Sequence, residues 1–343
     1  MANNTLNIIV ERNVPFLDCL DSVAEVHRLS PEEITPQAVA DADALVVRTR
    51  TRCDASLLDG SGVRFIASAT IGLDHIDLPW CRSHGITVAN APGCNAPAVA
   101  QYVFSSLMQV VNRPLSSYCL GIVGVGYVGS IVERWARQMS IPVMLCDPPR
   151  QEAEGGNEWH TLDELAAEAD IITFHTPLTS APAPYPTRHL ADVDFFCSLR
   201  RAPIIINSAR GSVINNQAWA AALDAGLCGP AIVDCWEGEP DINRELLAAA
   251  EVATPHIAGY SLEGKRRASQ MALDAICTYF GLTPMQISAP EPKGCPVSIT
   301  PAEALRSYDP TQDTAALKAN PANFERLRNT YEFRPEPCET FNK

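Results

Sequence analysis

The chain has 343 residues, of which 46% are hydrophobic and 19% are charged, and its formal net charge is −14 at pH 7. This length suits two domains, and the composition is typical of a globular protein. The negative charge argues against nucleic-acid binding and against an anionic membrane surface, because both partners require a basic face. No basic region followed by a long apolar stretch begins the chain, so we expect a cytoplasmic protein.

Twelve cysteines are scattered singly along the chain, without a CxxC pair. In a chain without an export signal, this spacing favours reduced thiols over disulfides, and it contains no zinc-ligand pattern. We therefore expect neither a disulfide framework nor a bound metal.

The first part of the chain alternates short apolar runs with helical or polar sequence. The runs cover residues 6–10, 44–48, 64–69 and 86–89. Such alternation is typical of a parallel sheet covered by helices. We therefore expect a small α/β domain in residues 1–95.

A helix is predicted next, over residues 96–112. Val99, Tyr102, Val103 and Leu107 recur at helical spacing and would form one apolar stripe. We interpret this helix as a crossing helix between two domains.

Six further apolar runs follow between residues 120 and 256, in the order LGIVGV, PVMLCD, IITFHT, PIIINSA, AIVDCW and VATPH. Six runs match a complete dinucleotide-binding sheet, which predicts a Rossmann-like domain over residues 113–260. A second crossing helix, predicted over residues 261–281, returns the chain to the first domain. That domain then comprises residues 1–95 and 261–283, and the Rossmann-like domain is inserted in it.

A GxGxxG motif stands where the first run of this second domain meets a helix. Gly124 would make a tight turn, Gly126 would let the pyrophosphate approach the backbone, and Gly129 would let the helix pack closely on the strand. The amides of Tyr127 and Val128 at the helix N-terminus would bind the phosphates.

Asp147 ends the next run, at the distance expected for a carboxylate that binds the adenosine ribose hydroxyls. Its charge favours NAD as the cofactor, although Arg150 nearby leaves NADP open.

Residues 259–265 nearly match a P-loop, but Arg266 stands where a Ser or Thr would ligate magnesium, so no nucleotide hydrolysis and no Mg²⁺ are expected.

Three polar residues follow three neighbouring runs. Oxidation of a 2-hydroxy acid needs a cation for the carboxylate and a base for the hydroxyl proton. Arg210 could grip the carboxylate, and Glu239 could orient His256 and stabilise its imidazolium. Each residue alone could equally be structural, but together they predict a catalytic set.

From residue 284 to residue 343 the sequence becomes Pro-rich and weakly periodic, with one helical patch over residues 323–333. This pattern predicts a small C-terminal extension. It could be an irregular domain, an oligomerisation arm or a loosely ordered tail.

Taken together, the glycine loop, Arg210, Glu239 and the Pro255-His256 pair resemble the D-2-hydroxyacid dehydrogenases, over about residues 6–280. The resemblance implies an inserted NAD domain, with Arg210, Glu239 and His256 in the roles argued above. Longer stretches resemble the branch of that family that oxidises 4-phospho-D-erythronate: LVVRTRT, TIGLDHID, NAPGCNA, GIVGVGYVG, LCDPPR, TFHTPL, VDCWEGEP and PHIAGYSLEGK.

This closer resemblance implies that the product is (R)-3-hydroxy-2-oxo-4-phosphobutanoate, that NAD is reduced, that the pathway is vitamin B6 biosynthesis and that the enzyme is a homodimer. It also implies substrate contacts at Thr49, Thr70 and Tyr260. Cofactor contacts are implied at Tyr127, Val128, Asp147, Thr176, Ser208, Ala209, Asp234 and Gly259.

A basic patch agrees with a phosphorylated substrate. Arg48, Arg50 and Arg52 alternate with threonines in an otherwise acidic chain. We expect Arg48 and Thr49 to hold the phosphate, with Lys265 or Arg266 opposite them, although Arg50 and Arg52 could simply be solvated.

Two other functions stay open on the sequence. One is oxidation of another D-2-hydroxy acid, such as 3-phosphoglycerate. The other is a non-catalytic, NAD-sensing binding protein, against which the complete set of Arg210, Glu239 and His256 argues.

Overall fold

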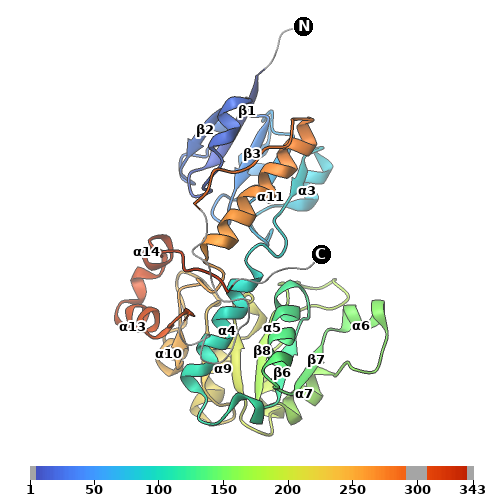
Figure 1. The fold of residues 1–343 in the computed structure, drawn as a ribbon, viewed down its shortest axis with the longest axis vertical. Helices are drawn as coiled ribbons and strands as arrows, with labels where there is room; N and C mark the ends of the chain where they lie inside the picture. Colours follow the sequence, from blue (N-terminus) through green and yellow to red (C-terminus); the bar gives the residue numbers. More distant parts are fainter. Residues whose placement is uncertain (1–4, 291–306, 338–343) are drawn as a thin grey trace. The chain divides into compact units, whose positions relative to one another are not determined.

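The computed structural model describes residues 5–290 and 307–337. The chain divides into two compact units (Figure 1). Unit 1 comprises residues 1–95 and 261–293, and unit 2 comprises residues 96–260 and 294–343. Each unit has one parallel sheet with buried clusters on both of its faces, so the predicted α/β class with two doubly wound sheets is confirmed. Within the described ranges, no helix is long and apolar enough to cross a membrane.

The sheet of unit 1 has the strand order β2-β1-β3-β4-β5, in which every neighbouring pair is parallel. This is the flavodoxin-like order. The strands are β1 (Leu6–Glu11), β2 (Ala24–Leu29), β3 (Ala44–Val47), β4 (Phe65–Ser68) and β5 (Thr87–Ala89). Four of them lie on the predicted apolar runs. The edge strand β2 was not predicted, because its sequence AEVHRL has little apolar character and is mostly exposed or half-buried.

Helices cover both faces of this sheet. Helix α11 (Leu262–Phe280) lies on one face, where it buries Ala272, Leu273 and Ile276 (Figure 1). Ser261 caps its first turn by accepting a hydrogen bond from the Gly264 N–H, and Gly281 ends it with a left-handed φ of 65°. The other elements of unit 1 are η1 (Asp18–Ser22), α1 (Pro36–Val39), α2 (Ala55–Leu58) and α3 (Leu78–Ser83).

The sheet of unit 2 has the order β11-β10-β9-β8-β6-β7, again parallel throughout. All six predicted runs are strands: β6 (Leu120–Val123), β7 (Val143–Cys146), β8 (Ile171–Phe174), β9 (Ile204–Asn207), β10 (Ala231–Val233) and β11 (Val252–Ala253). After β6 the chain first adds β7 on one side and then β8 on the other. This reversal creates the switch point beside β6, where open α/β sheets bind their ligands.

Two helical layers enclose the sheet of unit 2. Helices α4 (Ala96–Val110) and α5 (Tyr127–Gln138) cover one face, with the rings of Phe104 and Trp135 6.1 Å apart. The other helical elements are η2 (Leu115–Ser117), α6 (Pro148–Glu154), α7 (Leu162–Glu168), α8 (Val193–Ser198), η3 (Gly211–Val213), α9 (Asn216–Asp224), α10 (Arg244–Ala249), α13 (Thr311–Ala319), η4 (Pro321–Asn323) and α14 (Phe324–Asn329).

Two parts of the chain are grouped differently from the predicted domain boundaries. Helix α4, interpreted from the sequence as a crossing helix between the two domains, belongs to unit 2, because Tyr102, Phe104 and Leu107 are fully buried in that unit's core. Of the separate extension predicted over residues 284–343, residues 284–290 belong to unit 1. The C-terminal segment, residues 307–337, packs on unit 2, where Leu317 and Phe324 are fully buried. Which unit binds substrate and which binds cofactor stays a prediction.

Candidate active site

The glycine loop connects β6 with α5 at the switch point of unit 2. A Cβ atom at Gly129 would lie 2.1 Å from the carbonyl oxygen of Gly124, so only glycine allows this close turn. At Gly126 an added Cβ would meet no atom within 4 Å. Gly126 is also the N-cap of α5 and offers no side-chain cap to the first amides, which begin at Tyr127. The loop therefore presents open backbone that a phosphate could approach.

Asp147 follows β7 and lies beside this loop. Its carboxylate accepts hydrogen bonds from the N–H groups of Val125, at 2.7 Å, and Arg150, at 3.1 Å. The Arg150 guanidinium is occupied by the Glu154 carboxylate, at 2.7 Å, and by the Val125 carbonyl, at 2.8 Å. Because the guanidinium of Arg150 is already bound to other groups, the Asp147 carboxylate suits ribose hydroxyls better than a 2′-phosphate.

Two hydroxyl groups beside the switch point are buried without a hydrogen-bond partner among the described residues. They belong to Thr176, which follows β8, and Ser208, which follows β9. Thr176 packs directly on the glycine loop, since a Cβ at Gly124 would lie 2.9 Å from it. Buried polar groups normally have partners, so a ligand with hydrogen-bonding groups fits this place. These observations together fit a dinucleotide.

His256 and Glu239 form a hydrogen-bonded pair. Nδ1 of His256 lies 2.8 Å from Oε2 and 3.1 Å from Oε1 of Glu239, and Oε1 also accepts the Trp236 N–H at 2.8 Å. Burial raises the pKa of Glu239, but His256, the Trp236 amide and Arg328 outweigh it, so that this pKa lies below its usual value. Because a carboxylate only accepts, Nδ1 carries the proton and Nε2 is the nitrogen that can take another.

The His256 loop is held by Asp234, which is only 1% exposed. His256 has a left-handed φ of 57°, and its N–H donates to the Asp234 carbonyl at 2.9 Å. The next two amides, of Ile257 and Ala258, donate to the Asp234 carboxylate at 2.8 and 3.0 Å. Such a conformation persists only where its surroundings impose it. Asp234 thus anchors the loop that carries His256, and its contact with the cofactor stays a prediction.

Arg210 lies beside the loop that carries Glu239. A Cβ at the next residue, Gly211, would lie 1.9 Å from the Trp236 carbonyl oxygen, so the loops after β9 and β10 touch backbone to backbone. Ala209 connects the same two loops, because its carbonyl accepts the Cys235 thiol at 3.4 Å. As β9, β10 and β11 are neighbours, Arg210, Glu239 and His256 follow the carboxyl ends of adjacent strands.

Two arginines of the C-terminal segment reach this site, and neither was predicted from the sequence. Arg328 lies with Nη1 4.0 Å from Oε2 of Glu239, and its Nε donates to the Tyr260 hydroxyl at 3.2 Å. Arg334, 7% exposed, donates to the carbonyls of Ala98, Ile257, Ala258 and Tyr260. The segment therefore fixes the backbone around Gly259 and Tyr260 directly after His256.

A second His–Glu pair was also missed. Nε2 of His189 lies 2.6 Å from Oε1 of Glu237, two residues before Glu239. Asn216 adds to this contact, since its side-chain oxygen accepts the Glu237 N–H at 3.0 Å. These bonds anchor the start of the loop that bears Glu239.

The predicted phosphate residues lie in unit 1, after neighbouring strands. Arg48 and Thr49 follow β3 and Thr70 follows β4. The fully buried Glu11 shapes the first loop, because its carboxylate accepts the Arg48 N–H at 2.9 Å and the Thr51 hydroxyl at 2.8 Å. Thr49 is exposed, whereas the Thr70 hydroxyl lies 2.7 Å from that of Ser68.

Three other basic side chains of unit 1 have different surroundings. Arg52 is exposed and pairs with Asp54, with Nε 2.5 Å from Oδ2. Lys265 is buried within α11. Arg266 donates to the backbone carbonyls of Ala289 and Pro290. Of the basic patch, Arg48 is the residue whose backbone N–H binds the buried Glu11 carboxylate.

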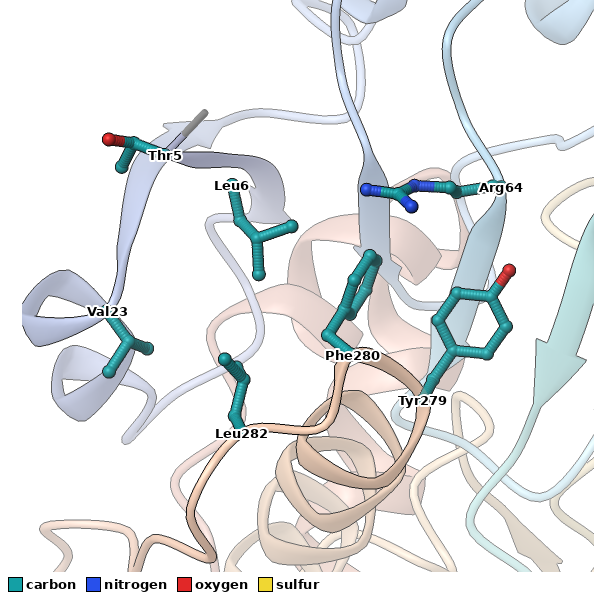
Figure 2. A pocket seen from close by; sticks show the side chains of 7 residues that line it. All are labelled: Thr5, Leu6, Val23, Arg64, Tyr279, Phe280 and Leu282. Carbon is teal, nitrogen blue, oxygen red and sulfur yellow. The ribbon is translucent and has the colours of Figure 1, made fainter. Parts of the chain in front are cut away.

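A pocket of about 630 Å³ opens in unit 1, at the edge of the sheet where the strands begin, opposite to the strand ends that precede Arg48 and Thr70. Figure 2 shows its lining, in which Thr5 and Arg64 stand at the amino ends of β1 and β4, and Tyr279 and Phe280 come from the end of α11. The Arg64 guanidinium lies 5.0 Å from the Phe280 ring centre and is paired with Asp43 at 2.8 Å. Ligands of open α/β sheets bind beyond the carboxyl ends of the strands, so this pocket is not part of the candidate site.

Comparison with known proteins decides the family. Residues 99–258 match the D-isomer specific 2-hydroxyacid dehydrogenase, NAD binding domain. An erythronate-4-phosphate dehydrogenase of Bacteroides fragilis is 47% identical in a 339-residue alignment that covers 96% of this chain and 97% of that protein. The chain belongs to the erythronate-4-phosphate dehydrogenase family. An erythronate-4-phosphate dehydrogenase of Porphyromonas gingivalis is 41% identical, over 97% of this chain and 94% of that protein.

Solved structures extend the likeness to the wider dehydrogenase fold. The TT0316 protein of Thermus thermophilus superimposes with a TM-score of 0.71 at 26% identity, covering 83% of this chain and all of that one. A D-lactate dehydrogenase of Aquifex aeolicus, complexed with NAD and lactic acid, gives the same TM-score at 22% identity, over 80% of this chain and 96% of its own. As a member of this family, the chain is an NAD-dependent oxidoreductase.

Proposed function

We propose that this chain oxidises 4-phospho-D-erythronate to (R)-3-hydroxy-2-oxo-4-phosphobutanoate, a step of vitamin B6 biosynthesis, with His256 as the proton acceptor. The observation that carries the proposal is the pair of His256 and Glu239, which lies beside Arg210 at the carboxyl ends of adjacent strands. Relatives up to 47% identical over nearly the whole chain bear the name of this activity, which supports the choice of substrate.

In this proposal the residues divide the work by charge. Arg210 binds the substrate carboxylate with its guanidinium. Nε2 of His256 accepts the proton of the hydroxyl group on C2, and Glu239 stabilises the imidazolium that results. When bound, NAD supplies the acceptor for the hydride that leaves C2, so the alcohol becomes a ketone. In the reverse direction His256 returns the proton.

The residues proposed to bind the cofactor lie at the same edge of the unit 2 sheet, at the carboxyl ends of its strands. Gly126 leaves the backbone open, Gly124 and Gly129 allow the close packing of the turn, and the amides of Tyr127 and Val128 would bind the pyrophosphate. Asp147 takes the ribose hydroxyls, and the buried hydroxyls of Thr176 and Ser208 gain partners in the bound dinucleotide. Ala209, Asp234 and Gly259 are assigned to the cofactor as well.

The substrate phosphate is assigned to unit 1. Arg48 and Thr49 offer a cation and a hydroxyl on the loop that Glu11 shapes. Thr70 follows the adjacent strand, and Tyr260 in unit 2 is assigned to the substrate as well.

We also assign the enzyme to the cytoplasm as a homodimer. Sedimentation at micromolar concentration tests the dimer, and a monomeric mass would refute it.

The decisive experiment follows NADH absorbance after addition of NAD and 4-phospho-D-erythronate, with D-3-phosphoglycerate as the comparison substrate. We expect a kcat/KM at least about 100-fold higher for the first substrate, since one well-placed recognition element contributes roughly 3 kcal/mol. A higher kcat/KM for D-3-phosphoglycerate would contradict the proposed substrate and favour that acid instead. Binding of NADH without turnover of either acid would favour a sensing protein.

A further inference from the structure

Arg328 occupies a place in the site that the family's Arg–Glu–His set does not account for. It lies on α14, about ninety residues after Glu239 in the sequence, and its side chain is only 12% exposed. Its Nη1 lies 4.0 Å from Oε2 of Glu239, the same oxygen that Nδ1 of His256 approaches to 2.8 Å. One carboxylate oxygen thus lies between an imidazole and a guanidinium.

The same guanidinium also fixes a hydroxyl group. Nε of Arg328 donates to the Tyr260 hydroxyl at 3.2 Å, and Nη1 lies 3.8 Å from the Glu325 carboxylate. Burial lowers the pKa of Arg328, but Tyr260 and Glu239 outweigh it and raise that pKa above the usual value. Arg328 is therefore a permanent cation at the pH values at which the enzyme works.

Several charged and titratable groups surround the pair. Glu239 faces His256 after β11, Arg328 on α14 and the Cys235 thiol at the end of β10. His256 faces Glu239 and also Asp234, whose pKa is raised by complete burial. Burial likewise raises the pKa of Cys235, which leaves this thiol neutral. Arg328 and Arg210 are the described cations near these groups whose charge does not change with pH, and Arg328 is the one that lies 4.0 Å from the Glu239 carboxylate.

We infer that Arg328 is a positioning residue, supplied by the C-terminal segment, which keeps Glu239 ionised and holds the Tyr260 hydroxyl in place. The inference rests on the proposed function of the Glu239–His256 pair. A cation beside the pair opposes its protonation, because each added proton increases the local positive charge. Without Arg328 the pair binds a proton more readily, and the base is lost at a higher pH.

The test measures kcat/KM against pH for the oxidation by the wild-type enzyme and by Arg328→Gln, Arg328→Lys and Arg326→Gln. We expect Arg328→Gln to move the acid limb of the profile to higher pH by on the order of one unit, because opposite charges at this distance shift titrations by that amount. Arg328→Lys should have its acid limb close to the wild-type pH, since lysine keeps the positive charge. Arg326 is exposed on the same helix, so Arg326→Gln should leave the profile unchanged.

Two results would overturn the inference. One is an acid limb of Arg328→Gln that coincides with that of the wild type while the variant unfolds at the wild-type urea midpoint. The other is an equal shift in Arg326→Gln, which would indicate a general surface-charge effect. Failure of the wild-type enzyme to oxidise 4-phospho-D-erythronate would instead refute the proposed function, so the two failures are distinguishable.

Discussion

At the scale of single residues, the local chemistry depends on groups that burial has separated from water. Glu239 stays a carboxylate because His256 and a backbone amide offset the cost of its burial. His175 shows the opposite outcome, since burial of its ring without a charged partner lowers its pKa to about 3. The two residues illustrate how a neighbour, and not burial alone, decides which form of a side chain is present.

His175 makes folding stability depend on pH in a defined direction. Between pH 6.5 and about 3 the unfolded chain protonates this residue and the folded chain does not, so its contribution is complete above pH 6.5 and is lost as the pH falls. We expect the stability of the wild type relative to His175→Gln to fall by about 2 kcal/mol between pH 7 and pH 5. Urea unfolding of both proteins measures this, and a difference that is equal at the two pH values would contradict it.

Arg48 provides a second prediction at this scale. If it binds the substrate phosphate, Arg48→Ala should raise KM for 4-phospho-D-erythronate by at least about tenfold, because a hydrogen bond to a charged group contributes roughly 1.5–3 kcal/mol. Steady-state kinetics should show a much smaller change for Arg52→Ala, as Arg52 is exposed and pairs with Asp54. Equal KM values for wild type and Arg48→Ala would remove Arg48 from the phosphate site.

At the scale of elements, the loops after the strands carry the candidate site, and their glycines have different tasks. Gly129 is required by the turn itself, whereas Gly126 has open space where its side chain would be. The two positions therefore separate folding from binding within one hexapeptide.

Gly126→Ala should keep the free energy of unfolding within about 1 kcal/mol of the wild type, because the added methyl group meets no protein atom. It should weaken NADH binding by at least about tenfold, since the methyl group would obstruct the pyrophosphate. Fluorescence titration and urea unfolding provide the two measurements, and Gly129→Ala is the control that should lose stability. Wild-type NADH affinity in Gly126→Ala would show that the phosphates do not approach here.

Much of this element-level structure could be predicted from the sequence, and the exceptions have physical causes. The six strands of unit 2 are continuous apolar runs because both faces of the sheet are covered, and the predicted second crossing helix is α11. Edge strand β2 and helix α13, with the sequence TQDTAALKA, have too few apolar residues to show a period. Tertiary packing, and not local pattern, determines both.

At the scale of the whole molecule, the C-terminal segment is part of the core of unit 2. Phe324 is fully buried there, and Nζ of Lys318 donates to the Ala250 carbonyl at 2.6 Å. The pairing of Glu239 with His256 could be expected from strand ends alone. The contacts of Arg328 and Arg334 with this site could not be expected, because residues 68 or more positions apart in the sequence meet only through this packing.

Phe324→Ala should therefore destabilise the described core of unit 2, and not only the tail. We expect a loss of about 3–5 kcal/mol in the free energy of unfolding, as for other buried phenylalanines. Urea unfolding followed by tryptophan fluorescence reports on this core, which contains Trp219 and Trp236. A loss below about 1 kcal/mol would mean that the segment can detach from unit 2 at little cost.

The central claim is that Nε2 of His256, oriented by Glu239, accepts the hydroxyl proton. The variant His256→Asn tests it most directly, because an asparagine amide can replace the Nδ1 contact with Glu239 but offers no base in place of Nε2. Measured with NAD and 4-phospho-D-erythronate, kcat should fall by about 10²–10⁴-fold. NADH affinity should stay within about twofold, because the pyrophosphate and ribose contacts are untouched. A kcat within tenfold of the wild type would contradict the account.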